Sequence, residues 1–405
     1  MATLPSQSED SRSHHGPFAV FLVFLRLGLT SFGGPVAHLA YFREELVRRR
    51  RWMSEAAYAD VVALCQCLPG PASSQTGIAL GLARAGYGGA LAAWVGFTLP
   101  SALLMILFAL GVTHYGMAAA PGVLHGLKLV AVVAQAVWGM ARSLCIGPAR
   151  IAITLIAAGT VLALPGPWIQ VAVMAAAAAA GIALVRPALA GAHEPLGLPV
   201  THRAGVLALV LFATLLAGLP MLAQLAADPA LRVFDAFYRA GALVFGGGHV
   251  VLPLLDAAVV APGWVGKGTF LAGYGAAQAM PGPLFTFAAF LGASMQMPPT
   301  GLAGGLLCAL AIFLPGALLV IGALPFWESL RRNRRAQAAL AGVNAGVVGL
   351  LLAALWNPVW TSAVRGPLDI VLVALALVAL MVWKLPPWLV VVVSGVAGWV
   401  AGLVA

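Results

Sequence analysis

Residues 24–35 read FLRLGLTSFGGP, and residues 237–248 read FYRAGALVFGGG, 213 positions further along the chain. Two more pairs of segments follow in the same order: QCLPGP at 66–71 with QAMPGP at 278–283, and FTLP at 97–100 with IFLP at 312–315. The three offsets are 213, 212 and 215 residues, so the spacing is nearly constant. Three markers in one order indicate an internal duplication. In membrane proteins, duplicated halves commonly enclose one binding site near the middle of the bilayer.

The composition identifies a membrane protein. Of the 405 residues, 62% are hydrophobic and only 8% are charged, and the mean hydropathy is +0.99. A soluble domain carries about 25% charged residues, so this chain has too few to cover a surface facing water. Its apolar segments are about 17 to 25 residues long, enough to cross a hydrocarbon core of ~30 Å as helices. We therefore predict an all-α polytopic membrane protein.

The apolar segments fall into two sets of six with one between them. The first set is predicted at 18–40, 58–83, 90–113, 123–141, 151–164 and 168–185, the single span at 204–226, and the second set at 234–254, 268–297, 301–326, 338–356, 367–383 and 386–405. This gives about 12 to 13 membrane spans, counting broken and re-entrant helices. The predicted domains are a polar, disordered tail at 1–17, a first repeat at 18–186, a linker with one connecting span at 187–231, and a second repeat at 232–405.

Two of the spans contain a Pro-Gly-Pro triplet, at 69–71 and at 281–283. Proline removes a backbone donor and clashes with the preceding turn of a helix. Each triplet is therefore expected to end a helix in mid-membrane and to produce a hairpin or a re-entrant pair. The Gly-Gly pairs at 33–34 and 246–247 are also expected to weaken their helices, because glycine is a poor helix former.

Arginine placement indicates that the two halves insert in opposite directions. In the first half, five arginines (Arg43, Arg48, Arg49, Arg50 and Arg51) lie between the first and second spans. In the second half, four arginines (Arg331, Arg332, Arg334 and Arg335) lie after the third span instead. Basic loops face the cytoplasm, which requires an inverted repeat. The net charge of +10 comes from such loops, so it argues against nucleic-acid binding.

Arg26 and Arg239 are the most informative side chains, because each lies inside an apolar span six residues before Phe-Gly-Gly. A cation in the bilayer costs at least ~2.5–3.5 kcal/mol unless it is paired or faces a polar cavity. One interpretation is an anion ligand, since guanidinium matches an oxyanion with paired donors. The alternatives are snorkelling to the interface or an internal salt bridge.

The remaining candidates surround the helix breaks. The Gly runs could expose backbone N–H groups to an anion at a half-helix N-terminus, or could simply allow close helix packing. Gln66 and Gln278 could donate to an oxyanion, or could tie off carbonyls freed by the Pro breaks. His249 could titrate near neutral pH, or could be a hydrogen-bonded packing residue. The full set of predicted substrate-binding residues is Arg26, Phe32, Gly33, Gly34, Gln66, Pro69, Gly70, Pro71, Arg239, Phe245, Gly246, Gly247, His249, Gln278, Pro281, Gly282 and Pro283.

Several classes of function have no supporting motif. The chain lacks the Gly-x-x-x-x-Gly-Lys-Ser/Thr nucleotide-binding loop, a cluster of metal-ligand residues and a nucleophile triad. The four cysteines (Cys65, Cys67, Cys145 and Cys308) lie in apolar surroundings and are interpreted as packing residues. We therefore expect neither enzymatic activity nor a cofactor. A membrane-embedded acyltransferase and a channel remain the alternatives outside transport.

The chain resembles the chromate ion transporter family through a combination of motifs. In the first half these are Arg26, Phe-Gly-Gly-Pro at 32–35, Arg51-Trp52 and Leu-Pro-Gly-Pro at 68–71, and the second half adds Phe-Gly-Gly at 245–247 and Pro-Gly-Pro at 281–283. The resemblance extends from about residue 18 to the end and fits the long, two-domain members. It implies a multi-pass protein of the bacterial inner membrane that exports chromate, driven by the proton or membrane gradient rather than by ATP.

The resemblance also implies that sulfate, which has the same shape and charge, competes with chromate, and that the proton is the coupling ion. A sulfate or other anion permease working inward is the alternative, and a homodimer is left open. One departure from symmetry is visible in the repeats, because Gly248 stands where the first half has Pro35. The two halves therefore need not contribute equally.

Overall fold

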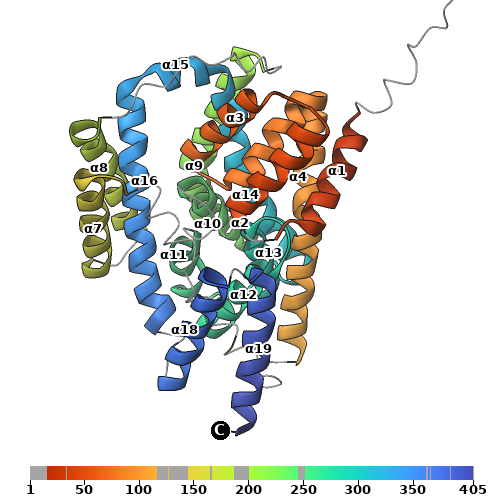
Figure 1. Ribbon diagram of the computed structural model, residues 1–405, viewed down its shortest axis with the longest axis vertical. Helices are drawn as coiled ribbons and strands as arrows, with labels where there is room; N and C mark the ends of the chain where they lie inside the picture. The colour runs from red at the N-terminus through yellow and green to blue at the C-terminus, as the bar shows by residue number, and fades with distance from the viewer. Residues whose placement is uncertain are drawn as a thin grey trace, which may run out of the picture.

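The computed structural model describes residues 16–32, 34–115, 126, 145–164, 167–186, 200–244, 251–361, 364, 366–383 and 385–404. All regular secondary structure in these ranges is helical, which confirms the predicted fold class (Figure 1). Apart from Gly126, the predicted span at 123–141 lies outside the described residues, as do most of the polar tail and residues 187–199 of the linker.

The first half consists largely of short helices. They are α1 (Pro17–Thr30), α2 (Gly34–Phe42) with the π-helix Arg43–Arg49, α3 (Glu55–Cys67), the long α4 (Ala72–Tyr115), α7 (Pro148–Ala163) and α8 (Pro167–Leu184). The helix α9 (His202–Leu225) connects the halves.

The second half follows the same order. Its helices are α10 (Pro229–Leu243), α11 (Val251–Leu255) with the π-helix Asp256–Val260, α12 (Lys267–Ala279), the 3-10 turn Leu284–Thr286, α13 (Phe287–Ser294), α14 (Gly301–Ala323), the 3-10 turn Leu324–Phe326, α15 (Trp327–Arg332), α16 (Arg334–Ala354) with the π-helix Leu355–Trp360, α18 (Pro367–Met381) and α19 (Pro387–Val404).

Helix α4 is a hairpin of two arms rather than one rod. Its backbone leaves the helical region at Ala85 and Gly86, where Gly86 has φ +62°. The arms, 72–84 and 87–115, pack so closely that a Cβ on Gly81 would collide with the carbonyl of Gly89. In the second half, the segment 284–294 and α14 take the places of these two arms. The second arm has 29 residues and a length of about 43 Å, so it can cross the membrane.

The second arm of α4 and helix α14 pack side by side and antiparallel, and the short hairpins of both halves pack against this central pair. Trp94 stacks edge-on to Phe313, with ring centroids 6.0 Å apart. Nearer the other end, Gly305 lies against Ile106, and Gly301 lies against Leu110. Because the residue numbers rise in one helix as they fall in the other, the two repeats insert in opposite directions.

The short hairpins confirm the inversion, because they pack at opposite ends of this central pair. At one end, α3 and the first arm of α4 form an apolar cluster with the last turn of α14, including Leu64, Ile78 and Val320. At the other end, α12 and α13 pack against the last turns of α4, where Phe290 and Ile106 share a cluster. Figure 1 shows α3 near the top of the molecule and α12 in its lower half.

Both Pro-Gly-Pro triplets break their spans, as the sequence predicts. Helix α3 ends at Cys67 and α4 begins at Ala72, while α12 ends at Ala279 and the next turn begins at Leu284. Helices α3 and α12 have 13 residues each, or about 20 Å, too short to cross ~30 Å of hydrocarbon. Among the described residues, four helical stretches are long and apolar enough to cross: the second arm of α4 within 72–114, and the helices 202–225, 301–326 and 334–353.

The two arginine-rich loops lie at the same end of the molecule. Met53, which follows the first loop, packs in the same apolar cluster as Leu330, which precedes the second. The shared end agrees with the charge pattern that predicts an inverted repeat. Around the first loop, Arg43, Arg48, Arg49 and Arg50 pair with Glu44, Glu45 and Glu55.

Reporter fusions test this arrangement in the cell. We expect fusions at Arg50 and at Arg334 both to report the cytoplasmic side, because basic loops are retained there. A fusion at Gly266, at the other end of the molecule, should report the periplasmic side. Opposite readings at Arg50 and Arg334 would contradict the shared end that the structure shows.

Candidate functional site

The two halves exchange equivalent hydrogen bonds at the centre of the molecule. The backbone N–H of Gly70 donates to the carbonyl of Val244 at 2.6 Å, and the N–H of Gly282 donates to the carbonyl of Ser31 at 2.8 Å. Ser31 and Val244 are the residues at which α1 and α10 end. Each Pro-Gly-Pro turn is thus joined to the broken helix of the other half. The four helix breaks, two from each repeat, are therefore joined in two pairs, and each pair contains one break from either half.

Only glycine fits at the tips of these two turns. Gly70 has φ +120° and Gly282 has φ +89°, a region that L side chains rarely adopt. A Cβ on Gly70 would lie 3.1 Å from the Cα of Gly316, and a Cβ on Gly282 would lie 2.9 Å from Oγ of Ser101. Ser101 and Gly316 are equivalent residues, each following the proline of the third predicted span. Each turn therefore touches the long helix of the opposite half through its backbone.

The first half places a buried polar run at this centre. The first turns of α4, after Ala72, contain four polar residues that are each at most 3% exposed: Ser73, Ser74, Gln75 and Thr76. A helix N-terminus carries roughly half a positive elementary charge and exposes free N–H groups, which favour an anion. The second half has Phe285, Thr286 and Phe287 in the equivalent turn. The centre is therefore polar on one side and aromatic on the other.

The sequence analysis missed this polar run, although four consecutive polar residues in an apolar span were a visible signal. Nε2 of Gln75 donates to the carbonyl of Pro69 at 2.8 Å and to that of Gly316 at 3.2 Å. Gln75 therefore performs the carbonyl-capping role considered for Gln66, whose side chain is exposed. Oε1 of Gln75 and Oγ of Ser74 are buried and have no partner among the described residues. Buried polar groups without a partner call for a functional explanation.

Variants of Gln75 and Gln66 test which of the two glutamines caps the carbonyls at the Pro break. We expect Gln75→Leu to lower the melting temperature and impair transport, because it leaves the buried carbonyl of Gly316 unbonded at ~1–3 kcal/mol and also removes the bond to the part-buried carbonyl of Pro69. Gln66→Leu removes an exposed side chain of the same size and should leave the melting temperature unchanged. Thermal unfolding of the purified variants in detergent is the measurement. Equal melting temperatures for both variants would contradict the capping role of Gln75.

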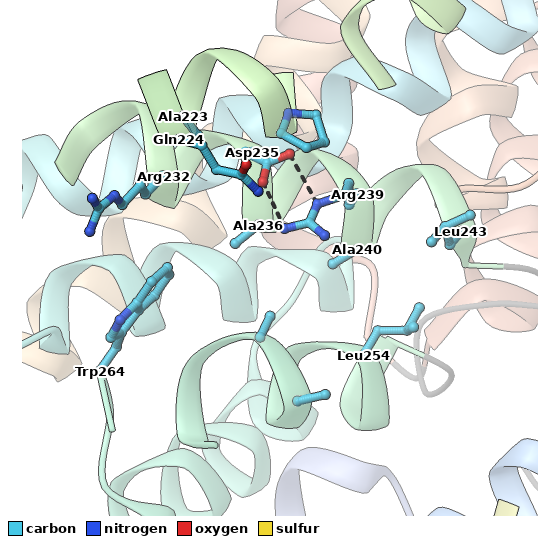
Figure 2. A pocket seen from close by; sticks show the side chains of 13 residues that line it. Ala223, Gln224, Arg232, Asp235, Ala236, Arg239, Ala240, Leu243, Leu254 and Trp264 are labelled. Carbon is cyan, nitrogen blue, oxygen red and sulfur yellow. Dashed lines mark hydrogen bonds and ion pairs between the residues drawn. The ribbon is translucent and has the colours of Figure 1, made fainter. Parts of the chain in front are cut away.

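A pocket of about 540 Å³ lies beside the centre, between α9, α10 and the segment from α11 to Trp264 (Figure 2). Arg239 lines it and pairs with Asp235 through two bonds: Nε to Oδ1 at 3.0 Å and Nη2 to Oδ2 at 2.7 Å. The Asp235 side chain is 6% exposed, whereas 41% of the Arg239 side chain is exposed. The internal salt bridge considered from the sequence is therefore present. The guanidinium nevertheless still faces the pocket.

Arg26 has different surroundings from its counterpart Arg239. Its side chain is exposed on α1, and Leu22 stands where the second half has Asp235. The charge of Arg26 helps to lower the pKa of Glu45, which lies on the π-helix that follows α2. Burial raises the pKa of Glu45, but the hydrogen bond from Arg50 and the charges of Arg50, Arg26 and Arg49 outweigh this and hold it below the ordinary range. The two arginines kept by the duplication are thus inequivalent.

The other predicted site residues are distributed around the breaks. Phe32 lies beside Trp388, with ring centroids 6.5 Å apart. Gly34 has φ +81° and faces open space. Gln278 is half-buried and hydrogen bonds with the hydroxyl of Tyr274. Pro281 and Pro283 are buried in the second turn. Gly33, Phe245, Gly246, Gly247 and His249 lie outside the described residues.

Known proteins similar to this chain point to one family. The family model for chromate transporters matches residues 18–182 and 231–399, one match in each half. A chromate transport protein of Pseudomonas aeruginosa is 30% identical over 98% of this chain and 96% of its own length. A probable chromate transport protein of Synechococcus elongatus is 28% identical over 93% of both chains. A chromate transport protein of Cupriavidus metallidurans is 27% identical over 88% of this chain and 85% of its own length. No solved structure matches the chain significantly.

Proposed function

The chain belongs to the chromate transporter family, and on this premise we propose that it exports chromate from the cytoplasm across the bacterial inner membrane. The observation that carries the proposal is the pair of crossed hydrogen bonds, Gly70 to Val244 and Gly282 to Ser31. They join two oppositely inserted repeats where broken helices end, the usual location of a substrate site in inverted-repeat transporters.

The chemistry at the centre suits a tetrahedral dianion. The N-terminus of α4 supplies backbone donors, and Ser74 supplies a buried hydroxyl without a partner among the described residues. These donors are neutral, so they can bind an oxyanion without holding it too tightly through excess positive charge. In the adjoining pocket, the guanidinium of Arg239 offers paired, charged donors. We assign the predicted residues of both Pro-Gly-Pro turns, both Phe-Gly-Gly runs, Arg26, Arg239, Gln66, Gln278 and His249 to this path as proposals.

Alternating access would follow from the inverted hairpins. The hairpin of α3 and the first α4 arm is at one end of the central helix pair, and the hairpin of α12 and α13 is at the other. Rocking of one repeat against the other would open the shared centre to one side and then to the other. We propose the proton as coupling ion and sulfate as a competing anion.

Everted membrane vesicles test the direction of transport. We expect vesicles from cells that make the protein to accumulate chromate when energised, above vesicles from cells without it, and we expect an excess of sulfate to reduce the uptake. Accumulation of sulfate by right-side-out vesicles, without chromate uptake by everted ones, would replace this proposal with an inward sulfate permease.

A further inference from the structure

We propose that Asp235 is an internal counter-ion that an oxyanion displaces from Arg239, so that the oxyanion and one proton bind the pocket together. This inference rests on the proposed function and names the residue that links the proton to the anion. Because the proton then leaves with the chromate, the membrane potential acting on the net charge of −1, rather than the pH gradient, drives the export. In the step, the oxyanion takes over donors of Arg239, the carboxylate of Asp235 leaves them, and a proton from solution adds to that carboxylate. Arg239 keeps its own charge throughout.

The geometry makes the two anions competitors. A guanidinium has five N–H donors, and Asp235 engages the edge that carries Nε and Nη2. The exposed part of Arg239 faces the pocket, so an oxyanion that binds there comes close to the carboxylate of Asp235. Two anions on one cation repel each other unless one of them is neutralised.

The charges that line the pocket support the same conclusion. Among the described residues that line the pocket, the charged ones are Arg232, Asp235 and Arg239, all on α10, and their net charge is +1. Helix α9 contributes Gln224, which is uncharged, and the segment from Leu254 to Trp264 contributes only uncharged side chains. A dianion is therefore matched in charge only when Asp235 is protonated.

The first repeat shows that an acid at the position of Asp235 is not needed to hold the arginine in its span. The residues equivalent to Arg232, Asp235 and Arg239 are Ala19, Leu22 and Arg26. Arg26 and Arg239 occupy equivalent positions in the two halves. Arg232 and Asp235 have no such counterparts, and they line the pocket that α10 forms with α9, a helix that lies outside the repeats. Asp235 therefore belongs to the pocket rather than to the shared scaffold.

Calorimetry of chromate binding to the purified protein tests the linkage directly. Titrations in buffers of different ionisation enthalpy give the number of protons bound, and the pH is kept alkaline enough that the added chromate is entirely the dianion. We expect uptake of about one proton per chromate by the wild type and of none by Asp235→Asn. The affinity of Asp235→Asn should also be less dependent on pH than that of the wild type.

Asp256→Asn is the matched control. Asp256 is also partly buried and lies on the next helical segment, but the charge nearest to it is that of Lys267, and it does not line the pocket. This variant should still take up about one proton.

Chromate binding by the wild type without proton uptake would overturn the proposal, and so would undiminished uptake by Asp235→Asn. If Asp235→Asn does not fold, the wild-type measurement decides alone, and Asp235→Glu should retain the uptake. Failure of the wild type to bind chromate at all would instead refute the proposed function.

Discussion

We expect transport to fall at least about thirtyfold in Gly282→Val, which corresponds to about 2 kcal/mol. A β-branched residue at φ +89° is strained by ~1–3 kcal/mol. Its Cβ would also press on Oγ of Ser101 and on the carbonyl of Phe97, at 2.9 and 3.1 Å. Both effects act on the turn that bonds to Ser31 in the other half. Gly70→Val should act similarly at the equivalent turn, where the Cα of Gly316 is the obstacle.

Gly263→Val distinguishes disruption of the second Pro-Gly-Pro turn, where it contacts Ser101 and Ser31, from the effect of backbone strain alone. Gly263 also has positive φ, +77°, but nothing lies within 4 Å of its Cβ position. We expect this variant to lose some stability and to transport at near the wild-type rate. Chromate uptake by everted vesicles, normalised to inserted protein, is the measurement. Equal transport by Gly282→Val and Gly263→Val would show that the crossing of the turns has no part in the site.

The second large effect is expected at the membrane arginines. Arg239→Gln removes the cation that faces the pocket while keeping some hydrogen bonding, so transport should fall more than tenfold, or about 1.4 kcal/mol. Arg239→Lys should rescue only partly, because an ammonium is a point charge rather than a fork. Arg26→Gln should also impair transport, though by a different factor, since Arg26 has no counterpart of Asp235 beside it.

The buried partner of Arg239 requires a control for folding. Arg239→Gln leaves the carboxylate of Asp235 without its cation, which can destabilise the protein by itself. The double variant Asp235→Asn with Arg239→Gln removes that charge and should restore protein levels without restoring transport. Arg203→Gln, an exposed arginine at the start of α9, should behave as the wild type. Normal transport by both membrane-arginine variants would assign Arg26 to snorkelling and Arg239 to a structural salt bridge with Asp235.

The features that the sequence predicted well are those that depend on local chemistry. Proline cannot continue a helix, so the breaks at 69–71 and 281–283 could be located without a structure. Likewise, the opposite placement of the arginine loops predicted the inversion that the antiparallel α4 arm and α14 display.

The crossed bonds could not be predicted, because they join Gly70 to a residue 174 positions away. Nothing in a single sequence indicates which breaks will meet. The pairing of Asp235 with Arg239 was more accessible, since four residues separate neighbours on one helix face. It was missed because the acid has no counterpart in the first repeat.

The internal duplication also favoured Gln66 over Gln75 as the predicted site residue. Gln66 has a mate in Gln278, whereas the residue equivalent to Gln75 is Phe287. The duplicated residues mark the shared architecture, which includes both turns and both arginines. The residues that differ between the repeats, such as Gln75 and Asp235, are those that make the centre and its pocket asymmetric.

Counterflow in proteoliposomes tests most directly whether the crossed turns enclose a chromate site. Liposomes with the purified protein are loaded with unlabelled chromate and diluted into a trace of labelled chromate, with no gradient of pH or voltage. We predict a transient accumulation of label above its equilibrium level that Gly282→Val abolishes and Gly263→Val retains. Uptake no faster than in protein-free liposomes, or equal accumulation by both glycine variants, would contradict the account.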